Sequence, residues 1–295
     1  MIDLLLPPIT AALVILSIHA YLGLHVLARE IIFVDLAFAQ IAALGATIGL
    51  VAGLHPGSAA TYALSFGFTL LGALLFTFTR VQHPRVPQEA LIGVTFVVAS
   101  AAVLLVASAT AQGAEHVSET LTGTLLWIRW PEVARLAAVY ALLGGFHYAF
   151  RRPILSLTFE WHTARHRRLW DFAFYVTFGL VITFSVAVAG VLLVFSMLVI
   201  PAAVAYLFVS RTGTALLLAW LSGAIAILLG VGTSFVWDLA TGPMLVCAFG
   251  VVLIGAGLLR LVLVRRSSPD AHAVNLESGS AAAAVGSAGS PGTKR

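Results

Sequence analysis

Long apolar runs, separated by short polar segments, follow one another along almost the whole chain. A run of about 20 residues that is apolar on every face crosses the hydrocarbon core of a bilayer as an α-helix. Strands of a membrane β-barrel would instead alternate apolar and polar residues. The pattern therefore predicts an all-α, polytopic transmembrane bundle of about nine spans, at residues 6–27, 32–54, 58–79, 89–110, 132–150, 172–188, 190–209, 213–236 and 242–264.

The number of spans depends on residues 172–209, where two helices must share one long apolar stretch. We expect the chain to turn near residues 187–190, which contain a glycine. If the stretch were one broken helix, the count would be eight. The charges of the flanking loops are consistent with nine.

Composition and charge set the compartment and the orientation. The chain is 60% hydrophobic and 9% charged, with a mean hydropathy of +1.03, whereas soluble domains carry roughly a quarter charged residues. The net charge of +4 comes mainly from arginines between the runs. Basic loops stay in the cytoplasm, which places 80–88 and 151–171 inside, the N-terminus outside and the C-terminus inside. No basic patch interleaved with aromatics suggests nucleic-acid binding.

Two further observations limit the chemistry. The chain contains no Walker GxxxxGK[ST], no GxSxG and no HExxH motif, so we expect neither a nucleotide site of its own nor enzyme activity nor a cofactor. Residues 267–295 are rich in Ser, Gly and Ala and are predicted to be a disordered cytoplasmic tail behind a membrane domain of residues 1–266.

The most basic segment is 151–171, and within it LSLTFEWHTARHRRLWDF (155–172) has helical periodicity. Phe159, His162 and His166 would share one strip of a short amphipathic helix, with arginines on the other faces. The pattern leaves two roles open. The helix either lies on the lipid surface or docks into a cytoplasmic partner.

Six blocks of sequence, in the right order, carry a resemblance to a known family. The blocks lie at 28–49, 86–106, 118–133, 157–181, 189–208 and 234–250. The first, AREIIFVDLAFAQIAALGATIG, is similar to a GDALSHAxLPGVAIG pattern, and the fifth, AGVLLVFSMLVIPAAVAYLF, is similar to VGLLLVxALLxxPAAxA. The chain thus resembles, over residues 20–265, the membrane permease subunits of ATP-binding-cassette (ABC) importers for zinc, manganese and iron.

The resemblance implies partners and a location. A permease of this family would form a homodimer in the bacterial plasma (inner) membrane, with two cytoplasmic ATPase subunits on segment 151–171. An extracytoplasmic binding protein would deliver a divalent metal ion, of the zinc or manganese class, to the outer face. In that scheme Glu160, Arg165, Arg167 and Arg168 transmit force from the ATPase and do no chemistry.

Polar residues inside the apolar runs are candidates for the transport pathway, because an intramembrane charge costs at least ~3 kcal/mol. The candidates are Asp35 and Gln40 in the second run and His19 in the first. The family's carboxylate and imidazole, one helical turn apart, fall on Leu36 and Gln40 here, so the usual metal-ligand pair is missing. A metal chelate or a non-metal solute therefore stays open as the cargo. A secondary transporter also stays open, although only Asp35 is a carboxylate deep in a span.

Overall fold

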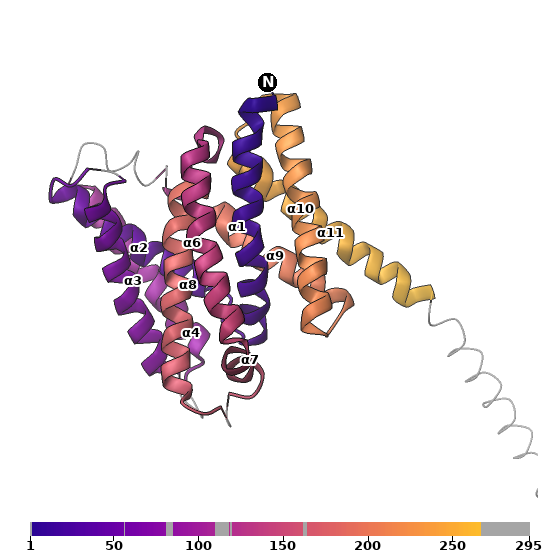
Figure 1. The fold of residues 1–295 in the computed structure, drawn as a ribbon, viewed down its shortest axis with the longest axis horizontal. Helices are drawn as coiled ribbons and strands as arrows, with labels where there is room; N and C mark the ends of the chain where they lie inside the picture. The colour runs from indigo at the N-terminus through magenta and orange to yellow at the C-terminus, as the bar shows by residue number, and fades with distance from the viewer. Residues whose placement is uncertain are drawn as a thin grey trace, which may run out of the picture. The chain divides into compact units, whose positions relative to one another are not determined.

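The computed structural model describes residues 2–55, 57–80, 85–109, 118, 120–161 and 164–266. These residues fold into helices and form no strand (Figure 1). The long helices are α1 (Ile2–Ala28), α2 (Val34–Val51), α3 (Ala59–Thr79), α4 (Gln88–Ala107), α6 (Trp130–Ala149), α8 (Arg167–Ala189), α9 (Val191–Phe208), α10 (Thr212–Trp237) and α11 (Thr241–Arg266). Two short elements are η1 (Leu125–Trp127), a 3-10 turn, and α7 (Arg151–Phe159).

Each predicted span coincides with one of these long helices. Within the described ranges, eight helices are long and apolar enough to cross a membrane on their own. The ninth, α6, meets that criterion only together with α7, from which it is bent by 74°. The all-helical, multi-span fold is therefore confirmed, with eight spans or nine when the bent pair is counted. The orientation of the termini stays a prediction.

By internal packing the chain divides into two units, residues 1–253 and residues from 254 onward. The first unit holds α1 to α10 and the first half of α11. In the second, the described residues continue α11 as far as Arg266. The predicted disordered tail, 267–295, lies outside the described residues.

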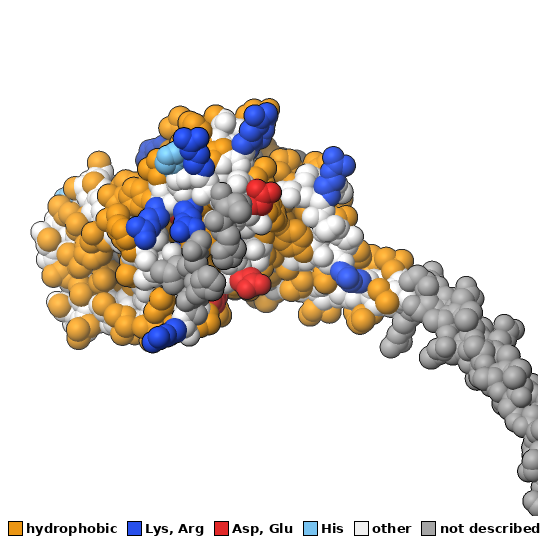
Figure 2. Space-filling model, turned by 90° about the horizontal axis from the view of Figure 1, so that it is seen from below, with side chains coloured by type: hydrophobic (Ala, Val, Ile, Leu, Met, Phe, Trp, Pro, Cys, Tyr) orange, Lys and Arg blue, Asp and Glu red, His pale blue; other side chains and the backbone are white. Residues whose placement is uncertain are grey.

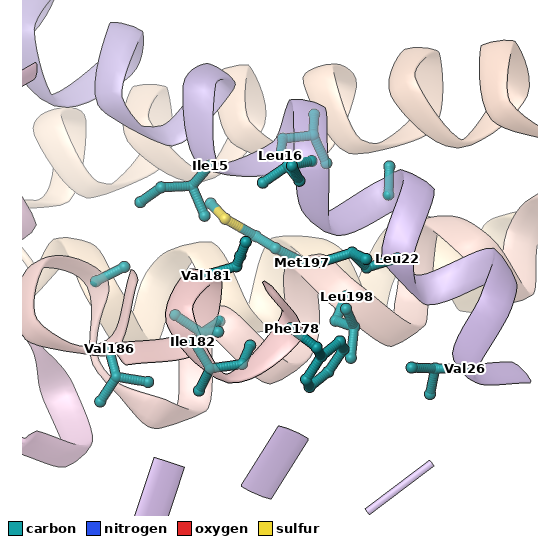
Figure 3. Close-up of a cluster of buried hydrophobic side chains, with 14 of the residues drawn as sticks. Ile15, Leu16, Leu22, Val26, Phe178, Val181, Ile182, Val186, Met197 and Leu198 are labelled. Carbon is teal, nitrogen blue, oxygen red and sulfur yellow. The ribbon is translucent and has the colours of Figure 1, made fainter. Parts of the chain in front are cut away.

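The core of the first unit forms where α1 packs against α8 and α9. Buried apolar side chains from all three helices pack together there (Figure 3). Close packing of this kind takes the place of a hydrophobic driving force between helices in lipid. The labelled members are Ile15, Leu16, Leu22 and Val26 of α1, Phe178, Val181, Ile182 and Val186 of α8, and Met197 and Leu198 of α9.

The predicted turn within 172–209 is confirmed, since α8 ends at Ala189 and α9 begins at Val191. Gly190 between them has φ of 77°, a conformation that residues with a Cβ rarely adopt. A Cβ there would also collide with the backbone of Leu121, Thr122 and Gly123. Both the angle and the close approach of the two segments require glycine.

The predicted single helix over 155–172 is wrong. Helix α7 ends at Phe159, Glu160 is its C-cap, and α8 begins at Arg167 after His166, whose φ is 52°. Phe159 and His166 therefore do not share a helical strip, and His162 lies outside the described residues. Contacts with other helices flank the end of α7: His25 and Arg29 bond the Thr158 hydroxyl, and Arg80, just after α3, stacks on Trp161 at 5.0 Å.

Candidate functional site: an outer vestibule and an inner ionic network

A pair of adjoining cavities opens at the end of α2 that lies away from Arg29. Their volumes are about 250 and about 580 Å³, and both are lined by Tyr62, Thr124, Thr183 and Ala187. We call this pair the vestibule. Its walls come from α2, α3, the 120–128 segment, the start of α6 and the end of α8. The smaller cavity is lined mainly by alanine and hydroxyl side chains, whereas aromatic and aliphatic side chains predominate in the larger one, together with Glu132 and Arg135. The hydroxyls of the smaller cavity can exchange hydrogen bonds with water or with a polar solute.

Asp35 lies further along the α2 face that lines the vestibule. Seven residues are nearly two helical turns, so Asp35 shares a strip with Ala42, which lines the vestibule about 10 Å further along the helix. The Asp35 side chain is buried, and neither carboxylate oxygen has a hydrogen-bond partner. A buried carboxylate without partners is costly, so Asp35 remains a candidate for the transport pathway.

Gln40 and His19 are also buried, but they point elsewhere. Gln40 lies about 140° around α2 from Asp35, by the helical repeat. The Nδ1 of His19 is 2.8 Å from the Ile15 carbonyl oxygen, and its ring packs edge-on against Tyr140 of α6. Among the described residues, no three His, Cys, Asp or Glu side chains come together as a metal site. The structure thus does not unite the three predicted pathway residues.

At the other end of the bundle, Asp171 of α8 joins two helix ends. Its Oδ1 accepts hydrogen bonds from Arg29, just after α1, at 3.3 Å and from Arg80, just after α3, at 2.8 Å. Arg29 is buried and its guanidinium lies 3.7 Å above the ring of Phe174. Burial lowers the pKa of Arg29 to about 10, although Asp171 opposes the shift, so Arg29 stays charged at neutral pH.

Thr158 connects α7 to this ionic network. Its Oγ1 accepts from Arg29 Nε at 3.0 Å and lies 2.7 Å from His25 Nδ1, and it donates to the Ile154 carbonyl at 3.0 Å. One hydroxyl offers one proton and two lone pairs, so His25 must be the donor in its contact with Thr158. The hydroxyl therefore makes all three hydrogen bonds open to it, two of them with His25 of α1 and with Arg29, just after α1.

Sequence reasoning missed Asp171 and Thr158 as members of this network. A usable signal did exist: Arg29 and Arg80 end two spans, and Asp171 begins a third, so the orientation places all three charges at one membrane face. Opposite charges at one buried helix end are expected to pair. The hydroxyl of Thr158 gave no comparable signal.

The four predicted coupling residues lie on either side of Trp161 in the sequence. Glu160, Arg165 and Arg168 are exposed, whereas Arg167 is half-buried and stacks on the Trp161 ring at 4.8 Å. Arg80 stacks on Trp161 as well, at 5.0 Å. Figure 2, seen from below relative to Figure 1, shows basic side chains gathered on this face with acidic ones among them. Glu160, Arg165 and Arg168 are therefore accessible at the end of the bundle where α7 lies.

Residues 1–260 match the model of the ABC 3 transport family. The chain belongs to the ABC 3 transport family. It is thus a membrane component of an ABC transport system and not an enzyme in its own right. The predicted family is confirmed, and a bacterial inner membrane fits the bacterial origin of the relatives that follow.

Three curated relatives of this ABC 3 protein carry transport names. The manganese transport system membrane protein MntC of Listeria innocua is 24% identical over 67% of this chain and 74% of its own length. The chelated iron transport system membrane protein YfeC of Yersinia pestis is 28% identical, with 68% and 71% covered. The manganese transport system membrane protein MntB of Synechocystis is 26% identical, with 73% and 76% covered.

Two solved structures share the fold of the ABC 3 protein. One is PsaBC from Streptococcus pneumoniae in complex with a Fab, with a TM-score of 0.71, 19% identity, and 86% of this chain and 90% of that chain covered. The other is a metal-chelate type ABC transporter in an inward-facing conformation, with a TM-score of 0.62, 19% identity, and 88% and 85% covered. At this identity the likeness concerns the fold.

Thr158→Val in this ABC 3 protein tests the link between α7 and α1. Valine keeps the shape but leaves Arg29 Nε and His25 Nδ1 without an acceptor, and each unmet buried donor costs about 1–3 kcal/mol. We expect a clear fall in the melting temperature of the purified protein. Thr158→Ser, which retains the hydroxyl, should stay close to wild type; equal losses in both variants would contradict the hydrogen-bond assignment.

Proposed function

We propose that the chain is the membrane-spanning permease subunit of an ABC importer for divalent metal ions. The observation that carries the proposal is the family match over residues 1–260 together with relatives named for manganese and chelated iron transport. These names favour manganese or iron as the cargo. The sequence alone did not distinguish zinc from manganese. A homodimer, two ATPase subunits and an external binding protein complete the proposed assembly.

In this proposal the metal enters through the vestibule and passes Asp35. The vestibule supplies hydroxyl groups that replace hydration water, and Asp35 supplies a negative charge deeper along the same face of α2. Carboxylate oxygens are ligands that Mn²⁺ and Fe²⁺ favour. In a homodimer a second Asp35 would double that charge.

The proposed coupling runs through segment 151–171. The exposed Glu160, Arg165 and Arg168 would contact the ATPase, and Arg167 would fix Trp161 behind them. Movement of that segment reaches α1 through Thr158 and α3 through the contact of Arg80 with Trp161. Alternating access then follows from rigid movement of helices that ATP closure displaces.

Metal accumulation in cells that lack this protein tests the proposal. Cells complemented with wild type should regain manganese or iron, measured together with zinc by mass spectrometry. Asp35→Asn, which is nearly isosteric, should reduce uptake about tenfold or more, equivalent to about 1.4 kcal/mol or more of lost stabilisation. Asp238→Asn, at an exposed position of similar chemistry, is the matched control.

Two results would overturn parts of this proposal. Unchanged levels of every metal in the deletion strain would refute metal import. Wild-type uptake by Asp35→Asn, with equal amounts of protein in the membrane, would remove Asp35 from the pathway while leaving the cargo assignment intact.

A metal chelate is the second candidate cargo. The vestibule favours it, because its volumes of about 250 and about 580 Å³ exceed the needs of a bare ion and the larger cavity is lined mostly by apolar side chains. Uptake of radioactive iron with and without an added small chelator separates the two. Uptake that rises with the chelator supports the chelate, and uptake that falls supports the ion.

A further inference from the structure

A second cavity, of about 600 Å³, lies among α1, α6, α7 and α10, apart from the vestibule. We call it the groove. Along α6 its lining runs from Tyr140 to the first residue of α7, Arg151, a rise of about 16 Å. This length equals about half of the ~30 Å hydrocarbon thickness of a bilayer. The groove therefore has the depth of one lipid leaflet.

The lining of the groove changes from apolar to polar along that length. Ile18, Gly144, Leu216 and Trp220 line one part, together with Ser17 and Tyr140. The hydroxyls of Ser17 and Tyr140 are already bonded within the protein, to the Val14 carbonyl and to Ser185. The other part is lined by residues near three helix ends that meet at the Arg29 face: His25 of α1, His147 of α6 and the start of α10 at Thr212. The groove therefore matches a phospholipid whose headgroup lies at the polar end, near the Arg29 face, and whose acyl chains lie along the apolar part.

Arginines lie near the polar end of the groove. Arg151 is exposed and lines it, with Nη1 3.2 Å from the Tyr148 carbonyl, and the exposed Arg211 directly precedes α10. Thr212 and Gly213, the first two residues of α10, line the same end, and the N–H groups at a helix start have no acceptor within the helix. A helix start and arginines together favour a phosphate. Basic pockets between transmembrane helices on the cytoplasmic side are typical sites for anionic headgroups.

His25 adds a second and independent indication of a ligand. Its Nδ1–H is committed to Thr158, which leaves Nε2 as a lone-pair acceptor, and this buried atom has no partner. His147 differs, because both of its ring nitrogens have partners: Nε2 lies 2.9 Å from the Thr177 hydroxyl and Nδ1 lies 3.3 Å from the Tyr21 hydroxyl. An acceptor nitrogen without a partner, such as His25 Nε2, favours a ligand that carries a hydroxyl donor.

We propose that the groove binds one phospholipid with an anionic, hydroxyl-bearing headgroup of the phosphatidylglycerol type. Its phosphate lies between Arg151 and the start of α10, and a headgroup hydroxyl donates to His25 Nε2. One acyl chain extends past Gly144 toward Trp220. The bound lipid stabilises the packing of α10 against α6 and α1. This role does not depend on what the transporter carries.

Glycines 144 and 145 offer a matched pair for the test. A Cβ added at either position meets no atom within 4 Å, but only Gly144 lines the groove. Leucine fits both sites without a backbone clash and favours the helix. Gly144→Leu therefore fills the acyl part of the groove, whereas Gly145→Leu adds the same group elsewhere on α6.

The experiment measures melting temperature of the delipidated, full-length protein in detergent as dioleoyl-phosphatidylglycerol is added. Wild type and Gly145→Leu should rise by about 4 °C or more with increasing lipid. Gly144→Leu should show no dose-dependent rise. Dioleoyl-phosphatidylcholine and inorganic phosphate should each give less than half of the effect, and Arg151→Gln should reduce the response to phosphatidylglycerol to that of phosphatidylcholine.

Native mass spectrometry provides the second readout, as the number of phosphatidylglycerol molecules retained per chain. Gly144→Leu should retain one fewer than Gly145→Leu. Equal retention and equal melting shifts in these two variants, or equal shifts with both lipids in wild type, would refute the proposal. If Gly144→Leu does not fold, an undiminished response of Arg151→Gln would refute it equally. No transport is measured, so the outcome is independent of the metal proposal.

Discussion

Asp171→Ala is expected to lower the free energy of unfolding by about 3–5 kcal/mol, the usual loss when one partner of a buried ion pair is removed. Asp171 is the acceptor that Arg29 and Arg80 share, and the Arg29 side chain is fully buried. Without the carboxylate, Arg29 would remain charged and buried against the ring of Phe174, with no negative charge beside it. The measurement is the melting temperature of the purified protein, together with its yield in the membrane.

Two further variants separate the charge from the shape at this position. Asp171→Asn keeps the size and one acceptor oxygen but loses the charge, so it should fall between wild type and alanine. Asp238→Asn removes the charge of an exposed carboxylate and should have little effect, because asparagine tolerates the left-handed backbone of this position, where φ is 51°. A melting temperature of Asp171→Ala close to that of Asp238→Asn would show that the arginines find other partners and that the network contributes little to stability.

Gly23→Ala is the second substitution with a large expected effect. Gly23 lies where α1 approaches α9 so closely that a Cβ would overlap the Leu198 carbonyl and approach the Ala202 Cβ to 3.2 Å. Because the obstacle is backbone, it cannot rotate away, and overpacking of this kind costs typically about 1–3 kcal/mol. We expect a lower melting temperature and poorer recovery from the membrane.

Gly67→Ala in α3 is the matched control, because a Cβ there meets nothing within 4 Å. Alanine is a better helix former than glycine by about 1 kcal/mol, so Gly67→Ala should be neutral or stabilising. The two identical replacements are thus expected to differ in sign. Stabilisation by both would contradict the close approach of α1 and α9.

The helices were predictable because an apolar run in a bilayer has few alternatives. Backbone groups without water must bond within the segment, so hydropathy alone located all nine long helices, and the glycine at 190 located the break between α8 and α9. The region around α7 was not predictable in the same way. Its periodicity suggested a single helix, but Thr158 and Trp161 are held by residues of α1 and α3, which local sequence does not reveal.

The candidate site was predictable only in part, for a similar reason. Asp35 stands out in sequence as a charge among apolar residues, yet its alignment with the vestibule depends on how α2 packs against α3 and α8. The ionic network joins Asp171 to arginines 91 and 142 residues away in sequence. Pairing over such separations is a property of the assembled bundle, and single residues indicate it only through shared depth in the membrane.

The bend of 74° between α6 and α7 has a mechanical consequence. A thrust along the axis of α7 is nearly at right angles to α6, so little of it becomes compression of that helix. In the proposed coupling, the α6–α7 junction would act as a hinge, and the displacement would pass sideways through the Thr158 hydroxyl to Arg29, just after α1. Glycines inserted at this junction would make it more flexible. Less of the displacement of α7 would then reach α1.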